Sequence, residues 1–573
     1  MKHWLTIIIL LLLCCSNINA QINTEQVMRS GKNALAYNDY MLSIQYFNLA
    51  IQSEPNQALP YLYRAIAKFN LEDFIGAEID ATEAIKRNPF IRDVFEVRGA
   101  ARQLMRNYDG ALDDYQKALD ALPQNRHILY NMAIVHKENG DEAKSEKILK
   151  QLVQDSPDNY RAYRGLAILK ISDKDSIGAL EYLDSTIRLN QTNYVDYMLR
   201  SYIEKDYDKA LLDINEAIKL SPYSSMCYVV RAQLYYKMNN TQKALDDYST
   251  AISINPNENI SQYNRAVILY EMGVLSKNEY DKEALLLAGN GVININKEPG
   301  LIHVEPHLKE QLIFNCPFLR HNENKIVKIK PEPLFAVSYY TTDVDAQFSP
   351  KIINEISEIN SSRLLRYDLI ITSHEPTESD SINLDDHLAA IDYYNYHISS
   401  PTPTVMDYFG RSIDYYILRD YASSVDDLNK TIEIAPDFML GYFMRAVART
   451  KKILAEEKQN IIEREKDAFP QIVQIEYVEV IEDWDKVISM QPRLAIAYYN
   501  KGYVLFAMGK YKEAISEFDK ALTLDPLMGE AYYNRGFAYM NIGEEDEAKE
   551  DISKAGELGV ASAYNLMKLI LRN

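Results

Sequence analysis

The sequence has few cysteines, and they define no framework. Cys14 and Cys15 stand within the first twenty residues, which leaves Cys227 and Cys316 for the rest of the 573-residue chain. Two cysteines at unrelated positions do not make a disulfide pattern, although an oxidising compartment would permit them to pair. A chain of this length buries a large core and does not depend on such a bond.

Basic residues are in the minority, and catalytic motifs are missing. Lys and Arg number 62 against 82 Asp and Glu, which gives a formal net charge of −20 without any local basic stripe. A surface of this sign repels nucleic acid, so we expect no nucleic-acid partner. The sequence contains no glycine-rich phosphate loop, G-x-S-x-G or H-E-x-x-H motif. We therefore predict no catalytic residue and no cofactor.

Metal-ligating residues gather at one place only. His303, Glu305 and His307 have the short spacing at which imidazole and carboxylate can share a divalent ion. Gly300 and Pro306 oppose the helix that would carry both imidazoles on one face. We predict no metal site.

Long apolar runs are absent from the sequence after its first twenty residues. Lys2 precedes an apolar run from Trp4 to Cys15, and the segment ends at the small residue Ala20. This pattern is typical of a cleaved secretory signal, so residues 1–20 are interpreted as a signal peptide and the mature chain is predicted to begin at Gln21. No later run is long enough to span a bilayer. We expect an exported protein of the bacterial periplasm.

A lipid anchor is the alternative at the N-terminus. Cys14 or Cys15 would then carry the acyl chain of a protein anchored to the cell envelope. Leu13 or Cys14 would precede it, where bacterial lipoprotein signals usually have a small residue. We favour the unanchored form.

Prolines recur at intervals of 34 residues, which indicates a stacked array of repeats. They stand at Pro55, Pro89, Pro123 and Pro157, at Pro222 and Pro256, and at Pro492 and Pro526. Within each period apolar residues recur every three or four positions, and a glycine or aspartate interrupts them near the middle. Each period is therefore predicted to be a pair of antiparallel helices. One pair cannot cover its own apolar faces, so the next pair must.

The same residue types return in every period. "AYYNKGYVLFAMGKYKEAISEFDKALTLDP" at 497–526 is echoed by "AYYNRGFAYMNIGEEDEAKEDISKAGEL" at 531–558. An aromatic residue is followed four positions later by a small one, as in the pairs Tyr61 and Ala65, Phe95 and Gly99, Tyr228 and Ala232, Tyr442 and Ala446, Tyr498 and Gly502, and Tyr532 and Gly536. This pattern resembles the tetratricopeptide repeat family. The resemblance implies an all-α fold, a right-handed α-solenoid of helix-turn-helix repeats.

Small residues let the two helices of a pair approach each other closely. We predict that Gly502 and Ala514 face one another, with the aromatic residue filling the space beside them. Paired acidic residues recur on the second helices, as in Asp113-Asp114, Asp246-Asp247 and Asp426-Asp427. We interpret them as an outward, solvated face.

The repeats fall into two arrays. About eight are predicted in an N-terminal array, residues 21–292, and about four in a C-terminal array, residues 405–573, which ends in a capping helix at 561–571. One C-terminal period is 22 residues longer than the rest, and the charged stretch at 451–474 is interpreted as a helical arm exposed to solvent.

Residues 293–404 break the pattern and are predicted to be a small α+β insertion. β-Branched and aromatic runs at 325–342 and 364–373 favour strands, the first delayed to Leu334 by two prolines. The stretches 350–360 and 384–398 favour helices.

The resemblance also implies where a partner binds, because first helices line the concave groove in this family. We call the aromatic residue that precedes the small one by four positions the wedge position. Aromatic residues that follow it project into the groove, with asparagines able to bond an extended backbone. Tyr-rich grooves with interspersed amides suit protein recognition. The candidate partner-binding residues are Tyr236, Tyr263, Tyr270, Tyr416, Tyr499, Asn500, Tyr503, Tyr533, Asn534 and Phe537, with Tyr130 projecting to the same face.

These features predict a non-catalytic, exported scaffold that binds a protein or peptide in its groove or holds a cell-envelope complex together. One alternative is a surface glycan-binding protein associated with an outer-membrane transporter, in which groove aromatics stack on sugar rings. The other is an enzyme with its active site in the 293–404 insertion.

Overall fold

The computed structural model describes residues 23–121, 125–255, 259–277, 280, 330–340, 353–374, 384–463 and 469–572. The predicted signal sequence, the His303 cluster and Cys316 lie outside the described residues. The chain divides into two compact units, Asp80–Leu319 and a second one made of Met1–Ile79 together with Arg320–Asn573. This division does not follow the array boundaries expected from the sequence, because it falls within the first array.

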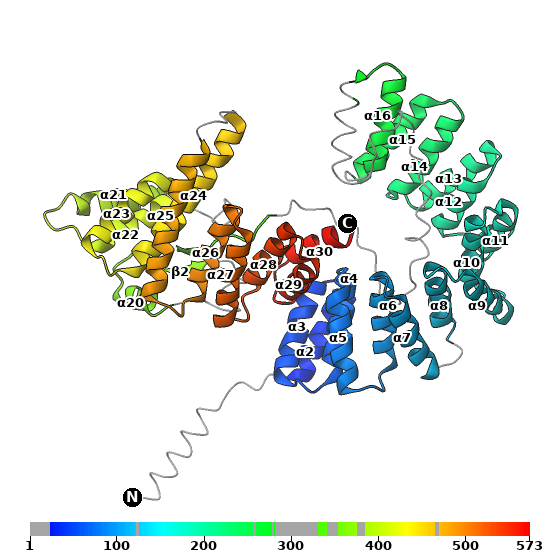
Figure 1. Ribbon diagram of the computed structural model, residues 1–573, viewed down its shortest axis with the longest axis horizontal. Coiled ribbons are helices and arrows are strands. Elements are labelled where there is room, and N and C mark those ends of the chain that lie inside the picture. The colour runs from blue at the N-terminus through cyan, green and yellow to red at the C-terminus, as the bar shows by residue number, and fades with distance from the viewer. Residues whose placement is uncertain are drawn as a thin grey trace, which may run out of the picture. The chain divides into compact units, whose positions relative to one another are not determined.

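The unit formed by residues 80–319 is a series of antiparallel helix pairs (Figure 1). Its helices are α6 (Arg92–Leu104) and α7 (Tyr108–Ala121), α8 (Arg126–Glu138) and α9 (Glu142–Asp155), α10 (Tyr160–Ser172) and α11 (Ser176–Leu189), α12 (Tyr194–Ile203) and α13 (Tyr207–Leu220), α14 (Ser225–Lys237) and α15 (Thr241–Ile254), and α16 (Asn259–Glu271). Most of the second half of the eighth predicted repeat lies outside the described residues.

The other unit combines the first helices of the chain with the last ones. The first are α2 (Thr24–Ala36), α3 (Tyr40–Ser53), α4 (Ala58–Asn70) and α5 (Phe74–Arg87), which runs across the boundary between the units. The last are α22 (Val405–Ile417), α23 (Tyr421–Ile434), α24 (Met439–Glu463), α25 (Phe469–Met490), α26 (Ala495–Ala507), α27 (Tyr511–Leu524), α28 (Gly529–Ile542), α29 (Glu545–Glu557) and α30 (Ser562–Arg572). The solenoid of helical hairpins that the sequence predicts is confirmed.

The insertion contains the elements expected of it. Strands β1 (Ala336–Ser338) and β2 (Ile370–Thr372) pair antiparallel, with Val337 opposite Ile371. Helices α20 (Asn354–Ser362) and α21 (Leu384–Ile398) occupy the two stretches that were predicted to be helical. The predicted arm is present as longer helices, since α24 has 25 residues and α25 has 22 against 13 in α26.

The close approach of paired helices rests on glycine. A Cβ atom added at Gly502 would lie 2.7 Å from the ring of Phe518, and one at Gly536 would lie 2.9 Å from Ile552. The atoms nearest to that added Cβ at Gly502 belong to Phe518 on α27. At the equivalent Gly536, the backbone oxygen of Ala548, the counterpart of Ala514, lies 3.1 Å from the added Cβ. The facing of Gly502 and Ala514 themselves stays a prediction. An aromatic ring on the second helix takes up the space that the glycine leaves.

In four repeats the wedge tyrosine uses its hydroxyl as well as its ring. Its hydroxyl donates a hydrogen bond to the carbonyl oxygen of the proline that closes the preceding repeat. The distances are 3.2 Å for Tyr61 to Pro55, 3.1 Å for Tyr228 to Pro222, 3.2 Å for Tyr442 to Pro436 and 3.1 Å for Tyr498 to Pro492. The proline backbone offers only an acceptor, its carbonyl oxygen, and the tyrosine hydroxyl is a donor far enough from the helix backbone to reach it. This contact accounts for part of the excess of tyrosine over phenylalanine and tryptophan.

The paired acidic residues have two different environments. Asp114 is fully buried and accepts two hydrogen bonds from the Arg98 guanidinium, at 2.7 and 2.9 Å, while Asp113 is exposed and pairs with Lys117. The same bidentate pairing joins Arg231 to Asp247 and Arg411 to Asp427. The prediction of an outward acidic face is therefore wrong for the second aspartate of each pair. That residue is a buried partner of an arginine on the first helix.

The last repeat of the chain packs against the first ones within the same unit (Figure 1). The carboxylate of Glu557 lies 2.7 Å from Lys68 Nζ and 3.4 Å from Arg64, and its carbonyl oxygen accepts hydrogen bonds from Asn48 and Gln45. Burial alone would raise the pKa of Glu557, but Lys68, Arg64 and Lys554 hold it well below its usual range. The terminal repeats of the sequence are thus neighbours in the fold.

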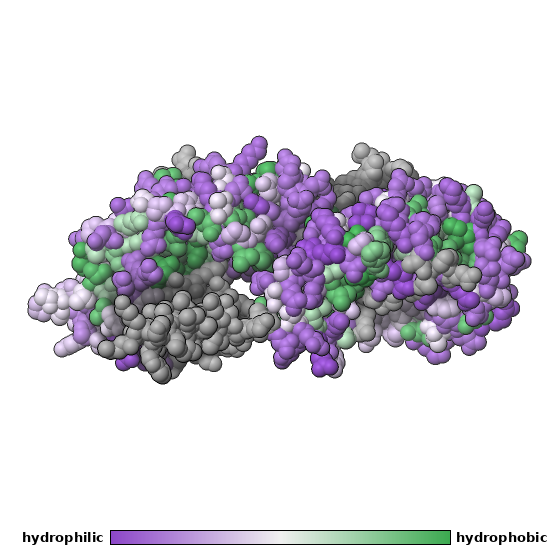
Figure 2. Space-filling model, turned by 90° about the horizontal axis from the view of Figure 1, so that it is seen from below, coloured by the Kyte–Doolittle hydropathy of each residue, from purple (hydrophilic) through white to green (hydrophobic). Residues whose placement is uncertain are grey.

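The hydrophilic character of the surface agrees with the many charged residues in the sequence. On the face shown in Figure 2, hydrophobic residues form smaller patches within a mostly hydrophilic surface. Among the described helices, none has both the length and the apolar character that a bilayer crossing requires.

Candidate protein-binding groove

Residues 330–338, which we call the groove segment, run along the first helices of the C-terminal repeats. Lys330 contacts α28, Phe335 contacts α26, and Val337 contacts α24 through the sulfur of Met444. The groove segment becomes strand β1 at its end, where it pairs with β2. The helix face that the sequence predicts to bind a partner is therefore covered by a segment of the same chain.

Two asparagines hold the backbone of the groove segment. Asn500 Oδ1 accepts from the Phe335 amide at 2.9 Å, and its Nδ2 donates to the Phe335 carbonyl at 2.8 Å. Asn534 repeats the arrangement at Glu332, with distances of 2.8 and 3.0 Å. A side-chain amide matches one peptide unit in this way because it offers one donor and one acceptor side by side. Both asparagines are at most 1% exposed.

Two tyrosines complete the backbone contacts. The Tyr499 hydroxyl lies 3.0 Å from the Glu332 carbonyl oxygen and 2.9 Å from that of Pro333, and the Tyr533 hydroxyl donates to Lys330 at 3.2 Å. Burial raises the pKa of Tyr499 and of Tyr533, so both hydroxyls stay protonated and able to donate.

The side chains of the groove segment fit this environment. Leu334 and Phe335 are 2% exposed, and the Phe335 ring meets the edge of Tyr499 at 5.2 Å between centroids. Pro331 and Pro333 lack an amide hydrogen, so they leave no donor unsatisfied against the helices. The Ser562 hydroxyl hydrogen-bonds the Glu332 carboxylate, whose pKa is raised by burial.

The remaining candidate residues have other neighbours. Tyr503 and Phe537 are half-buried, and the Phe537 ring packs on Phe506 at 5.3 Å. Tyr416 is buried and packs on Tyr421. In the unit of residues 80–319, Tyr236 donates to Glu271 at 2.8 Å. Tyr263 and Tyr270 share a neighbour, since Tyr263 bonds the Tyr280 hydroxyl at 3.0 Å and Tyr270 packs on the Tyr280 ring. Binding of a separate partner by these residues stays a prediction.

Sequence reasoning missed Met444, Ser562 and the groove segment itself as parts of this site. The alternation of prolines with charged residues in Lys330-Pro-Glu-Pro was a usable signal, because such a segment prefers an extended backbone with few donors.

A buried polar chain fastens the insertion to the repeats. His387 on α21 lies with Nδ1 2.6 Å from Asp414 on α22 and Nε2 2.7 Å from the Tyr340 hydroxyl. Both His387 and Asp414 are 2% exposed, and burial raises the pKa of Asp414 while His387 opposes that shift. His387 and Asp414 are enclosed by protein and Tyr340 is half-buried, so we interpret the three groups as a structural connection between β1 and the first C-terminal repeat.

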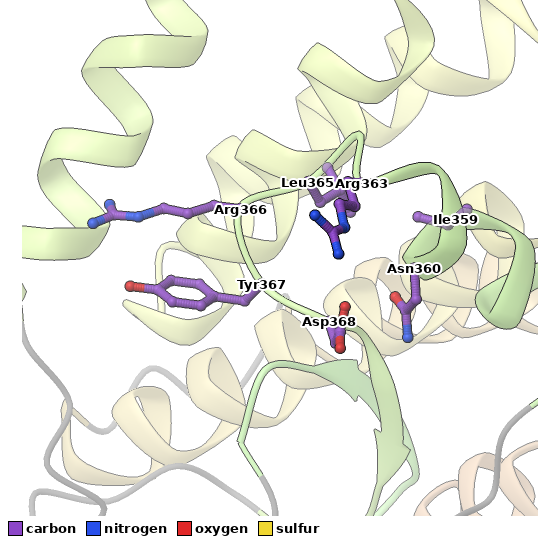
Figure 3. A pocket seen from close by; sticks show the side chains of 7 residues that line it. All are labelled: Ile359, Asn360, Arg363, Leu365, Arg366, Tyr367 and Asp368. Carbon is purple, nitrogen blue, oxygen red and sulfur yellow. The ribbon is translucent and has the colours of Figure 1, made fainter.

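A small hollow of about 220 Å³ lies at the turn between α20 and β2 (Figure 3). Arg366 and Tyr367 point away from Asn360 and Asp368 in this view, and the Asn360 amide is already bonded to the backbone of Leu369. These side chains do not converge on a common point.

Within the described residues, no group of histidine, cysteine and carboxylate side chains could hold a metal ion, and Cys227 is a buried thiol whose pKa burial raises to about 11.

Stacked helical hairpins with a groove on their first helices define a helical repeat protein of the solenoid class. Tetratricopeptide repeat models match residues 104–169, 225–258 and 529–558, and a TPR repeat model matches residues 502–543. These matches identify tetratricopeptide repeats in those parts of the chain.

Similar proteins share only parts of the chain. A TPR repeat-containing protein of Methanocaldococcus jannaschii is 22% identical over 40% of this chain and 36% of its own length. RNA polymerase II-associated protein 3 of Xenopus laevis is 31% identical over 17% of this chain and 16% of its own. The chain thus spans about a third or less of these relatives.

Parts of the chain are also similar to solved structures. A tetratricopeptide repeat protein from Parabacteroides merdae covers 43% of this chain and 98% of its own, with 17% identity and a TM-score of 0.38. The C-terminal part of a TPR repeat-containing protein from Cytophaga hutchinsonii covers 41% and 97%, with 16% identity and a TM-score of 0.31.

Proposed function

We propose that this protein is a non-catalytic, exported scaffold that binds an extended segment of a partner protein on the first helices of its N-terminal repeats. The observation that carries the proposal is the groove segment. It demonstrates within this chain that the Tyr-Asn face of a first helix binds extended backbone, through Asn500 and Asn534. Because the groove segment is tethered, it competes with a separate partner for the C-terminal first helices at a high effective concentration. We therefore place the partner on the N-terminal repeats.

The test of partner binding compares baits that differ in groove tyrosines. Residues 21–573 are immobilised and exposed to cell-envelope extract, and retained proteins are identified. We expect a defined set of proteins whose capture falls when Tyr236 and Tyr270, half-buried on α14 and α16, are both changed to alanine. Tyr223→Ala is the matched control, since Tyr223 is 74% exposed just before α14. Equal retention by all three baits would contradict groove binding.

Export is tested separately. Residues 1–30 fused to alkaline phosphatase, which is active only in an oxidising compartment, should give activity in a bacterial host, and N-terminal sequencing of the full chain should read from Gln21. An acylated Cys15 would replace the periplasmic proposal with a lipid-anchored one. In the part of the chain that the structure describes, no contact favours the glycan-binding or the enzyme alternative.

A further inference from the structure

Helix α21 has the place of a second helix in the repeat pattern. Arg411 on α22 donates to Asn395 on α21, sixteen positions earlier, as Arg445 on α24 donates to Asn429 on α23. A second helix packs on the first helix of its own repeat, as α23 packs on α22. Among the described helices of its unit that precede α21, none packs on it in this way. Helix α21 is therefore a second helix without a described first helix of its own.

The residue that a first helix would cover is exposed on α21. Two positions before Asn429, α23 has Asp427, which is 4% exposed and bound by Arg411 on α22. The same position of α21, two before Asn395, is Tyr393, which is 58% exposed. The side of the helix that is closed in the neighbouring repeat is thus open to solvent at Tyr393.

The outer side of α21 is apolar where other second helices are charged. Lys117 on α7 and Lys430 on α23 stand at the position that Tyr396 occupies on α21, and Tyr396 is 79% exposed. Leu384 and Leu388, earlier on the same helix, are 57% and 47% exposed. The large exposed apolar residues of this helix, which we call the α21 face, are Leu384, Leu388, Tyr393 and Tyr396.

Acidic residues lie within the α21 face. Asp385, Leu388, Asp392 and Tyr396 follow one another at intervals of three or four residues, so acidic and apolar side chains alternate along one side of the helix. Both of these aspartates are exposed. The face therefore combines an apolar surface with negative charge.

The helix does not supply cations for these aspartates, since α21 contains no lysine or arginine. On α7, Lys117 pairs at 2.6 Å with the aspartate four residues before it, and the same two positions of α21 hold Tyr396 and Asp392. Arg366, from the turn before β2, pairs with Asp386 at 3.5 Å. A second copy of the chain, whose net charge is −20, would bring further negative charge. Charge complementarity therefore favours a basic occupant over a second copy.

We propose that α21 binds a basic amphipathic helix of a partner protein, which takes the place of the first helix. The apolar side of that helix packs on Leu388, Tyr393 and Tyr396, and its lysine or arginine side chains pair with Asp385 and Asp392. Apolar burial supplies most of the affinity, and the exposed ion pairs select a basic sequence. The site goes beyond the proposed groove binding, because it lies on a second helix and accepts a helix instead of an extended segment.

The probe is a phage-displayed library of amphipathic helical peptides, selected on residues 21–573. The apolar side of each peptide is fixed as leucine and alanine, and the flanking positions vary among lysine, arginine, glutamine and glutamate. We expect lysine and arginine to be enriched. Binding of the selected peptides, measured by fluorescence anisotropy, should weaken at least tenfold in Tyr396→Lys and at least threefold in Asp392→Asn. Absence of enrichment, enrichment of glutamate, or equal binding to Tyr396→Lys would overturn the proposal.

Two exposed positions of the same unit serve as controls. Leu527→Ala removes an apolar side chain that is 67% exposed just before α28. Asn541→Leu adds one on α28, where the exposed Asn541 amide donates to the Phe537 carbonyl. Neither variant should change peptide binding. A loss in Leu527→Ala as large as that in Tyr396→Lys would mean that apolar peptides adhere without a site, and would overturn the proposal.

Other occupants of the α21 face are tested on the free protein. Tyr396→Lys should not lower the melting temperature, and Tyr396→Cys in a Cys316→Ser background should react with a maleimide as fast as Leu527→Cys does. A lower melting temperature or slow labelling would mean that the chain itself covers the face. A dimer in sedimentation velocity that Tyr396→Lys abolishes would place a second copy there. Either result would overturn this proposal and leave the proposed groove binding, which is tested at Tyr236 and Tyr270, unaffected.

Discussion

The adjacent residues Asp113 and Asp114 differ in how much they contribute to the stability of the fold. Asp114 is buried against Arg98 and Arg102, and Asp113 is exposed beside Lys117. Removal of one partner from a buried ion pair typically costs about 3–5 kcal/mol, because the remaining charge stays in a poorly solvated place. We expect Asp114→Ala to lower the free energy of unfolding by about that amount.

Asp113→Ala is the matched control for this prediction. An exposed i, i+4 pair contributes about 0.3–0.5 kcal/mol, so this change should be nearly silent. Urea denaturation followed by circular dichroism measures both variants. Equal losses in the two would show that the buried pairing is not as we describe it.

Glu96 and His127 should have opposite effects on stability as the pH changes. Burial raises the pKa of Glu96 from 4.5 to about 7, so its contribution to stability is present below pH 4.5 and is lost as the pH rises to 7. Burial lowers the pKa of His127 from 6.5 to about 4, so its contribution is present above pH 6.5 and is lost as the pH falls to 4. Between pH 4.5 and 6.5 the two slopes oppose each other.

Single variants should reveal each slope. Relative to wild type, Glu96→Gln should gain stability as the pH rises from 4.5 to 7, and His127→Gln should lose stability as the pH rises from 4 to 6.5. Each slope is at most about 1.4 kcal/mol per pH unit, the value for one proton. Chemical denaturation at half-unit intervals measures them, and variant profiles parallel to wild type would refute the assigned shifts.

At the scale of the helix pair, the glycine on the first helix sets the separation. A side chain at position 502 would enter the ring of Phe518, which is itself fully buried. Overpacking of this kind typically costs about 1–3 kcal/mol. We therefore expect Gly502→Leu to lower the melting temperature. Ala507→Leu, at the exposed end of the same helix, should leave it unchanged.

A double variant identifies the contact. Phe518→Leu makes room on α27, so Gly502→Ala should cost less in that background than in the wild type. Additive losses would mean that the two positions do not meet.

The groove segment is held at identifiable points, so its release can be measured. Asn500→Leu removes the acceptor of the Phe335 amide and the donor to its carbonyl. Because a buried peptide unit without partners costs about 1–3 kcal/mol, amide exchange at residues 330–338 should accelerate roughly tenfold or more. Hydrogen exchange with mass spectrometry measures this. Asn541→Leu should not change the rate, and unchanged exchange in Asn500→Leu would contradict the role of Asn500.

At the scale of the whole chain, Glu557 joins the last repeat to the first ones. We expect Glu557→Gln to destabilise the unit by about 3–5 kcal/mol at neutral pH, since it removes the carboxylate shared by Lys68 and Arg64. The pKa of Glu557 is lowered in the folded protein, so its contribution is present above pH 4.5 and is lost as the pH falls below that value. The difference between variant and wild type should shrink in acid.

Glu545→Gln serves as the control, because Glu545 is 69% exposed in its side chain and pairs only weakly with Lys549. Calorimetry at pH 7 and pH 3 measures all three proteins. A pH-independent difference would contradict the charge-based account.

The sequence was sufficient for whatever depends on local periodicity. The helix pairs, the longer α24 and α25, and both short strands follow from apolar spacing, prolines and β-branched runs that lie within a few tens of residues. The burial of Asp114 was also readable, because an arginine recurs sixteen positions before it in other repeats, at Arg231 and Arg411 relative to Asp247 and Asp427. That spacing was overlooked because each aspartate was interpreted alone.

Contacts between distant parts of the chain could not be predicted in this way. Tyr499, Asn500, Tyr533 and Asn534 were identified as groove residues, but Asn500 binds a residue 165 positions away, and no periodic pattern connects the two. The packing of Glu557 on α3 and α4 likewise depends on which helical face happens to remain uncovered. Residues 405–573 expressed alone would lack both the groove segment and α2 to α4, so that fragment is a poor test of groove binding.

The contact between Gln45 and Glu557 also imposes an order in time. The two residues are 512 positions apart. At ribosomal speeds of ~5–20 residues per second, roughly 25–100 s pass between the synthesis of one and of the other. During that interval Lys68 and the neighbouring apolar residue Ile44, both buried in the finished protein, lack the repeat that covers them. The nascent chain must therefore keep its first repeats from binding elsewhere until its last helices have been made.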